Sequence, residues 1–405
     1  MKERHGAISS LLFVASSIHP MIYELASDLA KRHVRVCPVI LQYRNWKMVG
    51  IVIQAFSFLI RLIVHDFFSV RKLLVPRAMS LRSLLYYFYF FGIANMIVGL
   101  DQEFKFDIIH AFWSYPAGIA SFMAKIFIRK PLVISVLGYD VDKRTLENPM
   151  LREVSRLTLE GADAVITGVG NHYLVTSVLG IEEEKVHLLP APVNTARFSP
   201  EVNSVLVRKR YGIRDEDSIV AFGPHLREVY DPGSFLRAAA IVQHRMPNVT
   251  FMLLGAGNLR PKLEEMARRL GVRAVFTGKV PYSEMPFYYA AVVVYCMPCY
   301  AGVGISALEA MASGKPVIGY KRKIGWVGTG ATDIVDGVDS FLVRPGDVKE
   351  LAEKMLFLLE NPSVSREMGL NARKRIASQH NLSLYVEEHL RIYDIVVRAF
   401  GLSRA

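Results

Sequence analysis

The feature that most constrains this fold is the repeated alternation of short apolar runs with amphipathic stretches in both halves of the chain. At the start, apolar runs at 9–15 and 34–41 flank a stretch at 18–32 whose apolar residues recur with helical spacing. Two strands joined by a helix form a parallel pair, because the helix returns the chain to the end where the first strand began. The sequence therefore predicts an α/β fold with a parallel sheet.

This alternation continues along the chain. Further strands are predicted at 106–113, 131–140, 162–170, 185–193, 218–223, 249–255, 273–278, 292–298, 316–320 and 340–346. Helices are predicted between them at 116–128, 234–244, 260–270, 283–291, 306–313 and 348–360. A chain of 405 residues exceeds one ordinary core, so we expect two doubly wound, Rossmann-like domains that face each other across a cleft.

A polar segment that contains a proline, at 194–204, separates the two halves. Such segments are typical of domain boundaries. We therefore expect an N-terminal domain at 1–200 and a C-terminal domain at 205–385. The remaining stretch, 386–405, is predicted to be a helix that packs back toward the N-terminal domain.

Composition narrows the class of protein. The chain is 52% hydrophobic and carries a formal net charge of +12, which describes a folded protein that favours anionic partners. Its three cysteines, Cys37, Cys296 and Cys299, are too few for a disulfide scaffold and suit a reducing, cytoplasmic location. Cys296 and Cys299 have the Cys-x-x-Cys spacing, but no second pair completes a zinc site. We interpret them as two small buried residues at a strand end rather than as a redox pair.

Residues 46–100 are unusually rich in apolar and aromatic side chains. The run "LLYYFYFFGIANMIVGL" carries no charge over 17 residues, which is borderline for a membrane span. Basic residues lie around the apolar runs: Arg61, Arg71, Lys72, Arg77 and Arg82. Three interpretations stay open: helices packed on a sheet, a basic and aromatic surface that rests peripherally on an anionic membrane, or a true span.

Two interpretations also apply to Glu309, a lone carboxylate in the small, apolar stretch "CYAGVGISALEAMASGKPV". Ser306 and Glu309 fit a helix capping box, in which each side chain bonds the backbone amide of the other residue. Alternatively, Gly302 and Gly304 would let a diphosphate approach the helix N-terminus, and the carboxylate would then bind the ribose hydroxyls. Both can hold in one protein.

The same stretch resembles a known family. "VGISALEAMASGKPVIGY" is similar to the signature of the family 4 glycosyltransferases of the GT-B fold. "FDIIHAFWSYPAGIAS", "EKVHLLPAPVNTARFSP" and "VFTGKVPYSEMPFYYAAVVVYCMP" also resemble segments of these enzymes, so the likeness covers most of 105–360 in order. These enzymes transfer a sugar from a nucleotide-sugar to an acceptor, with retention of anomeric configuration and usually without a metal.

The resemblance assigns the donor site to the C-terminal domain. It implies that Glu309 binds the ribose and that Gly302, Gly304, Ile305 and Ser306 hold the diphosphate. It also places a phosphate-binding loop in "FGPHLREVYDPGSFLRA". The candidates in that loop are Gly223, His225 and Arg227, with Arg227 as the catalytic cation, because Pro232 occupies the position of the usual lysine.

For the N-terminal domain, the resemblance and the position of the first strand–helix turn suggest an acceptor site. His19, Tyr139 and Asp140 are the candidates, and His19 and Asp140 are also expected to take part in catalysis. His110 matches a family histidine, but a packed histidine at a strand is the commoner role. Asp142 forms an Asp-x-Asp pattern with Asp140 that we interpret as a surface loop rather than a metal site.

Three departures from the family bear on catalysis. Ala301 replaces an acidic residue, Leu137 replaces a histidine, and "SSIHPMI" replaces a glycine pair. Each change affects the predicted catalysis more than the predicted nucleotide binding.

We therefore expect a retaining glycosyltransferase that uses a UDP- or GDP-linked sugar and a saccharide or lipid-linked acceptor in glycoconjugate or polysaccharide biosynthesis. One alternative is a catalytically impaired nucleotide-binding protein that acts as an assembly partner. A second is a nucleotide-sugar epimerase on the same fold, although the acid–base pairs that this chemistry needs are scarce here. No nucleic-acid-binding module is recognised, so no nucleic-acid partner is expected.

Overall fold

The computed structural model describes residues 8–15, 19–41, 81–138, 140–141, 143–223, 225–300, 302–321 and 334–402. The contacts divide the chain into two units. Unit 1 comprises Met1–Leu189 together with Val386–Ala405, and unit 2 comprises Pro190–Tyr385. The chain thus enters unit 2 before the polar segment at 194–204, and it returns to unit 1 at its end.

Unit 1 is built on a six-stranded parallel sheet. Its strands are β1 (Ser10–Ala15), β2 (Arg35–Ile40), β3 (Ile108–Phe112), β4 (Leu132–Val136), β5 (Ala164–Thr167) and β6 (Val186–Leu188). Their spatial order is β2-β1-β3-β4-β5-β6, and every neighbouring pair is parallel. The order reverses between β1 and β3, and ligands of such sheets bind beside the carboxyl ends of strands at this kind of reversal.

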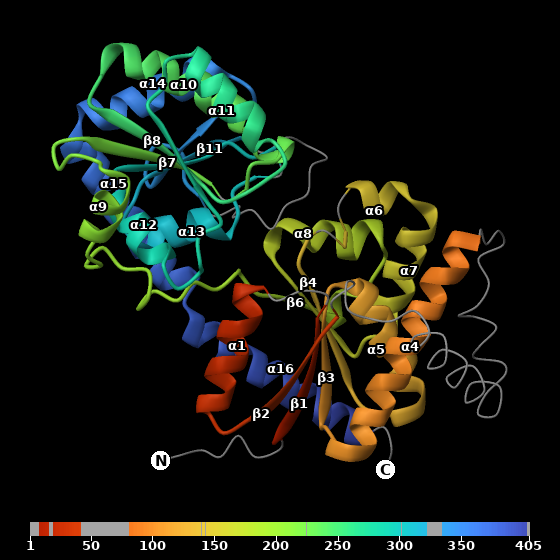
Figure 1. Cartoon of the computed structure of the whole chain (residues 1–405). Coiled ribbons are helices and arrows are strands. Elements are labelled where there is room, and N and C mark those ends of the chain that lie inside the picture. Colours follow the sequence, from red (N-terminus) through yellow and green to blue (C-terminus); the bar gives the residue numbers. More distant parts are fainter. Residues whose placement is uncertain are drawn as a thin grey trace, which may run out of the picture. The chain divides into compact units, whose positions relative to one another are not determined.

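Helical segments connect and flank these strands. They are α1 (Pro20–Lys31), α4 (Leu81–Phe104), η1 (Ser114–Gly118), α5 (Ile119–Ile128), α6 (Lys143–Glu147), α7 (Pro149–Glu160), α8 (Val169–Tyr173), η2 (Leu174–Val178), η3 (Glu183–Lys185) and α16 (Leu382–Leu402). Successive side chains of β3 point to opposite faces of the sheet, as in any β-strand. Ile109 and Ala111 join the core that contains α4 and α5, whereas His110 meets Tyr393 of α16 (Figure 1).

Part of the apolar region at 46–100 forms the second half of α4, which packs along α5 (Figure 1). Phe90, Ile93 and Ile97 are buried in the unit 1 core, and between positions 89 and 100 only Gly99 is exposed. This part therefore packs on the protein. Within the described parts of the chain, no helix is long and apolar enough to cross a membrane.

The remainder of that region lies outside the described residues. This includes Arg61, Arg71, Lys72 and Arg77, and the side chain of Arg82 is likewise not described. The interpretation of this part as a membrane-facing surface therefore stays a prediction.

Unit 2 contains a second six-stranded parallel sheet. Its strands are β7 (Ser218–Phe222), β8 (Val249–Leu254), β9 (Ala274–Gly278), β10 (Val294–Met297), β11 (Val317–Tyr320) and β12 (Ser340–Val343). Their order is β12-β11-β10-β7-β8-β9, with parallel pairing throughout. Here the order reverses between β7 and β10. The two predicted parallel sheets are confirmed.

The helices of unit 2 are α9 (Val205–Tyr211), η4 (Glu228–Tyr230), α10 (Pro232–Arg245), α11 (Arg260–Arg269), α12 (Met285–Ala291), α13 (Ile305–Ala312), α14 (Val348–Glu360) and α15 (Pro362–Gln379). The five predicted helices of this half correspond to α10, α11, α12, α13 and α14. The sequence did not predict α9 and α15. Arg373 of α15 connects this helix to other parts of the unit, because its side chain donates to the carbonyls of Thr195, Phe198 and Ala312.

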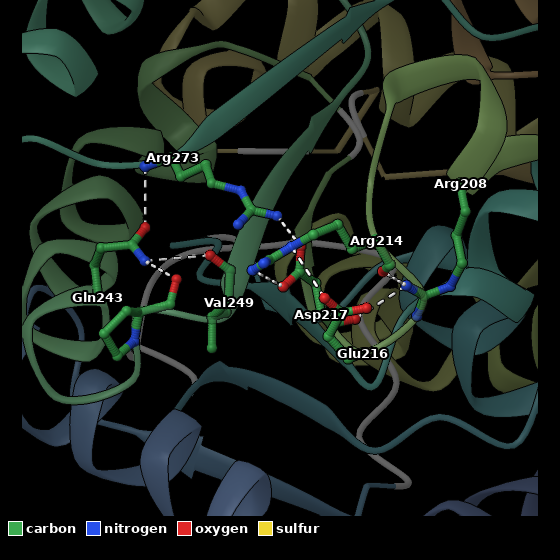
Figure 2. Close-up of polar contacts among 8 residues, drawn as sticks. Arg208, Arg214, Glu216, Asp217, Gln243, Val249 and Arg273 are labelled. Carbon is green, nitrogen blue, oxygen red and sulfur yellow. Dashed lines mark hydrogen bonds and ion pairs between the residues drawn. The ribbon is translucent and has the colours of Figure 1, made fainter.

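The amino edge of the unit 2 sheet is held by a cluster of arginines around one buried carboxylate (Figure 2). Asp217, directly before β7, accepts hydrogen bonds from Arg214 and Arg273. Arg208 donates to the backbone carbonyls of Arg214 and Asp217 at 2.8 and 3.0 Å. Because ligands of parallel sheets bind at the carboxyl edge, we assign this cluster a structural role.

Candidate functional site

Two loops meet at the carboxyl edge of unit 2, where the strand order reverses. One follows β7 and spans 223–231, and the other follows β10 and spans 298–304. The amide of Tyr300 in the second loop donates to the carbonyl of Val229 in the first at 3.0 Å. Leu226 anchors the first loop from the other side, because its amide donates to the carbonyl of Ala256 at 3.2 Å.

Glycines allow these loops to pack closely. A Cβ atom at Gly223 would lie 2.6 Å from the hydroxyl of Tyr295, and one at Gly304 would lie 2.9 Å from Cε of Met297. Gly302 has a φ of 90°, a backbone conformation that residues other than glycine rarely adopt. The glycines were predicted to let a ligand approach the backbone. They are also needed for the packing of these loops when no ligand is bound.

The predicted capping box at Ser306 and Glu309 is wrong. The N-cap of α13 is Gly304, which has no side chain to cap the helix. The Ser306 hydroxyl is directed instead to the sulfur of Met297, at 3.5 Å, and the Glu309 carboxylate accepts from Tyr289. The helix begins two residues earlier than the capping box requires, so Ser306 is already inside the first turn.

This start leaves two backbone donors at the helix end. The amides of Ala307 and Leu308 donate to the carbonyl of Gly304, whereas those of Ile305 and Ser306 have no partner among the described residues. Unpaired amides at a helix N-terminus carry a partial positive charge and bind anions. α13 therefore presents an anion-binding end at the reversal point.

Arg227 adds a full positive charge in the adjoining loop. Its side chain is exposed and makes no hydrogen bond or ion pair within the described parts of the chain. Desolvation of its ring, followed by the charge of Arg227, lowers the pKa of the nearby His225. Arg227 is therefore the stronger candidate for an anion ligand, because His225 is neutral at pH 7.

Glu309 is the fifth residue of α13, and only 5% of its surface is exposed to solvent. Its Oε2 atom accepts a hydrogen bond of 3.0 Å from the hydroxyl of Tyr289. Burial, and then the Glu309 charge, raise the pKa of Tyr289 well above its usual value, so the tyrosine remains a donor. Sequence reasoning did not identify this tyrosine.

A second unpredicted element is the carboxylate of Asp231. Its Oδ1 atom caps α10 by accepting from the amide of Ser234 at 3.1 Å. Its Oδ2 atom accepts from the hydroxyls of Tyr300 and Tyr320 at 3.0 and 2.8 Å. One signal for it was available, because an Asp that precedes a Pro is typical of a helix N-terminus.

In unit 1, the structure places Asp140 in a buried loop junction. Its Oδ2 atom accepts from the amide of Ser114 at 2.7 Å, and its Oδ1 atom accepts from the amide of Gly138 at 3.1 Å. Burial raises its pKa to about 6, although these amides oppose the shift. Asp140 thus joins the loops that follow β3 and β4. Tyr139 and Asp142 lie outside the described residues.

His19 caps α1 at the carboxyl end of β1. Its Nδ1 atom accepts from the amide of Met21 at 3.3 Å. Burial lowers its pKa to about 4, so it is neutral at pH 7. Its ring lies 6.4 Å from that of Trp113, which follows β3 on the other side of the reversal point. His19 therefore lies where a ligand of unit 1 is expected.

His110 has a structural environment. It is fully buried, with one ring nitrogen 2.6 Å from the hydroxyl of Tyr393 and the other 2.8 Å from that of Ser135. Burial lowers its pKa well below the usual value. The packed role, which links α16 to the sheet, accounts for this histidine.

The candidates thus fall into two groups. Unit 2 brings together the candidate donor-site residues Gly223, His225, Arg227, Gly302, Gly304, Ile305, Ser306 and Glu309. Unit 1 places His19 and Asp140 on the carboxyl edge of its own sheet. Ala301 lies outside the described residues. In the described parts of the chain, no group of three or more His, Cys, Asp or Glu residues could hold a metal ion.

Comparisons with known proteins cover both halves. A family described as "Glycosyl transferase 4-like domain" matches residues 17–192, and one described as "Glycosyl transferases group 1" matches residues 216–361. A GDP-mannose-dependent alpha-(1-6)-phosphatidylinositol monomannoside mannosyltransferase of Mycolicibacterium smegmatis is 29% identical over 296 residues, which are 69% of this chain and 74% of that protein.

Two further comparisons extend this result. A D-inositol 3-phosphate glycosyltransferase of Kribbella flavida is 30% identical over 225 residues, so 52% of this chain matches about half, 51%, of that protein. The solved structure of HepE from Anabaena in complex with UDP-glucose has the same fold, with a TM-score of 0.69 and 18% identity over 98% of this chain and 100% of that one. The chain therefore belongs to the group 1 glycosyltransferases, as its motifs predicted, and it is a glycosyltransferase with the GT-B fold.

Proposed function

We propose that unit 2 binds a nucleoside-diphosphate sugar and that the enzyme transfers the sugar, with retention and without a metal, to a saccharide or lipid-linked acceptor bound by unit 1. The observation that carries this proposal is the convergence of three features at one reversal point. They are the amides of Ile305 and Ser306 and the Arg227 cation, none of which has a partner among the described residues, and the buried carboxylate of Glu309.

The geometry supports separate contacts to the diphosphate and to the ribose of the donor. Negative charge develops on the diphosphate as the bond to the sugar breaks. The α13 amides are fixed before the reaction, so they stabilise that charge without reorganisation, and Arg227 in the adjoining loop adds a full positive charge. Glu309, one turn further into the helix, offers carboxylate oxygens that suit ribose hydroxyls.

The tautomer of His19 supports a specific role in the acceptor site. Because Nδ1 accepts from the amide of Met21, the proton of the neutral ring resides on Nε2. Nε2 would then donate to an acceptor oxygen, and it would not act as a general base. The contacts of Asp140 support a role in holding the loops after β3 and β4 in place.

Three observations support an acceptor linked to a lipid at the cytoplasmic face of a membrane. The Mycolicibacterium relative is named for a phosphatidylinositol-linked substrate. The region at 46–100 combines aromatic and basic residues, and the net charge of +12 favours an anionic surface. The low number of cysteines, three in the whole chain, suits a reducing compartment.

A transfer assay tests the proposal. The enzyme is incubated with UDP- and GDP-linked hexoses and candidate acceptors, and both free nucleoside diphosphate and glycosylated product are measured. We expect stoichiometric product with one donor, and about a 100-fold loss of kcat/KM in Arg227→Ala. Arg366→Ala, at an exposed arginine of α15 without a described partner, is the matched control.

Two other outcomes separate the alternatives. Nucleotide binding without any product would indicate the catalytically impaired binding protein. Interconversion of the donor sugar without transfer would indicate the epimerase. The glycosyltransferase relatives of both halves support transfer over these alternatives.

A further inference from the structure

The side chain of Tyr289 is held in one orientation by the packing around it. It lies on α12, is fully buried and meets two aromatic rings edge-on. The ring of Tyr295 lies 5.4 Å away at 76°, and that of Phe198 lies 5.7 Å away at 64°. Edge-to-face packing of this kind restricts the orientation of a ring. The position of the Tyr289 hydroxyl is therefore determined by the unit 2 core.

That hydroxyl contacts the carboxylate assigned to ribose binding. It donates to Oε2 of Glu309 at 3.0 Å in a buried setting. A glutamate side chain has three rotatable bonds, so a carboxylate without such a contact would lose conformational freedom when it binds a ligand. A hydrogen bond from a rigid donor removes most of that freedom beforehand, and preorganisation of this kind raises affinity.

From these contacts we propose that Tyr289 is a positioning residue that orients Glu309 and thereby makes the donor site selective for ribose over 2′-deoxyribose. This inference rests on the proposed function, because it takes Glu309 as the ribose ligand. Tyr289 itself does not touch the nucleotide. Its effect acts only through the direction in which the Glu309 carboxylate points.

The neighbouring residue provides a matched control. Tyr288 lies on the same helix and is also buried, but its hydroxyl accepts from Arg210 at 2.9 Å and lies 3.0 Å from that of Tyr211. Tyr288→Phe therefore removes one hydrogen-bonded hydroxyl from α12 without affecting Glu309. Tyr289→Phe keeps the aromatic packing and removes the hydroxyl that contacts the carboxylate.

The experiment compares dissociation constants for UDP and 2′-deoxy-UDP, and for GDP and 2′-deoxy-GDP, by calorimetry. We expect the parent protein to prefer the ribonucleotide of one pair by about tenfold or more, because the deoxy compound leaves a buried acceptor unpaired. Tyr289→Phe should lower this preference to about twofold, mainly through weaker ribonucleotide binding. Tyr288→Phe and the parent should share the same preference.

The outcomes are distinguishable. A Tyr289→Phe protein that unfolds at the same temperature as Tyr288→Phe and keeps the full ribose preference would overturn the positioning role, while the proposed function would stand. If Glu309→Gln retains the preference as well, the ribose role of Glu309 falls and this inference falls with it. A parent protein that binds none of the four nucleotides would overturn both the inference and the proposed function.

Discussion

The hydroxyl of Tyr320, the last residue of β11, donates a 2.8 Å hydrogen bond to Oδ2 of Asp231, the residue that caps α10. The same oxygen accepts from Tyr300, which follows β10. One carboxylate therefore connects the loops after β7 and β10 to the end of β11, next to the site of Arg227 and the start of α13.

Removal of this carboxylate should loosen the donor loops. Asp231→Ala loses the helix cap and leaves two tyrosine hydroxyls without their acceptor. We expect a loss of about 1–2 kcal/mol in the free energy of unfolding and weaker nucleotide binding. Urea unfolding and calorimetry measure the two effects, with Asp215→Ala, an exposed aspartate, as the control. Unchanged nucleotide affinity in Asp231→Ala would show that the donor loops do not depend on this connection.

The Asp217 cluster predicts a specific response to acid. Hydrogen bonds from Arg214, and then Arg273, hold the pKa of Asp217 at about 2, below the ordinary value of 3.8. A depressed carboxylate pKa stabilises the folded state above the unfolded pKa, and this stabilisation disappears as the pH falls toward 2.

Asp217→Asn should therefore unfold at a lower urea concentration than the parent at pH 7, because Arg214 and Arg273 lose their ion pairs with this carboxylate. The difference should shrink between pH 4 and pH 2, where the parent carboxylate becomes protonated. Urea titrations across this pH range measure it. A difference that stays constant down to pH 2 would mean that the charge of Asp217 does not contribute.

We predict that sugar transfer needs no divalent metal, because in the proposed donor site the α13 amides and Arg227 neutralise the diphosphate. Prolonged dialysis against EDTA should change the transfer rate by less than about twofold, whereas Arg227→Ala should lower it strongly. A loss of activity in EDTA that added Mg²⁺ or Mn²⁺ restores would contradict this prediction.

The proposed membrane surface makes a separate prediction about the acceptor. Replacement of Arg71, Lys72 and Arg77 by glutamine should lower transfer to a lipid-linked acceptor in vesicles with anionic lipid by at least about tenfold. Transfer to a soluble saccharide acceptor should stay unchanged, which controls for folding. Equal effects of the triple substitution on both acceptors, or no effect on either, would exclude the membrane role of these residues.

The sequence predicted the parallel sheets well because buried strands and their connecting helices leave a local pattern. The candidate donor residues were also found from local motifs, since Gly302 to Glu309 and the loop of Arg227 are each continuous in sequence. The capping box failed for a physical reason. Ser306 has the right spacing to Glu309, but these two side chains contact Met297 and Tyr289 instead. Those residues lie on β10 and α12, outside the local motif.

Tertiary contacts account for the other misses. The two partners of Asp231, Tyr300 and Tyr320, come from separate strand ends, and no local pattern indicates that they meet. The acceptor-site role of Asp140 was predicted from its place after a strand and stays a prediction, but its buried contacts were not foreseen. Its actual partners include the amide of Ser114, which becomes a neighbour only when β3 and β4 pair.

The most direct test of the central claim is a calorimetric titration of the parent protein with UDP, GDP and ADP, repeated with Glu309→Ala and Arg227→Ala. We predict that one nucleoside diphosphate binds with a stoichiometry of one, and that each substitution weakens its binding by about tenfold or more. Glu353→Ala and Arg366→Ala, at exposed positions of α14 and α15, should bind as the parent does. Absence of saturable binding, or equal affinity in all five proteins, would contradict the assignment of the donor site to the start of α13.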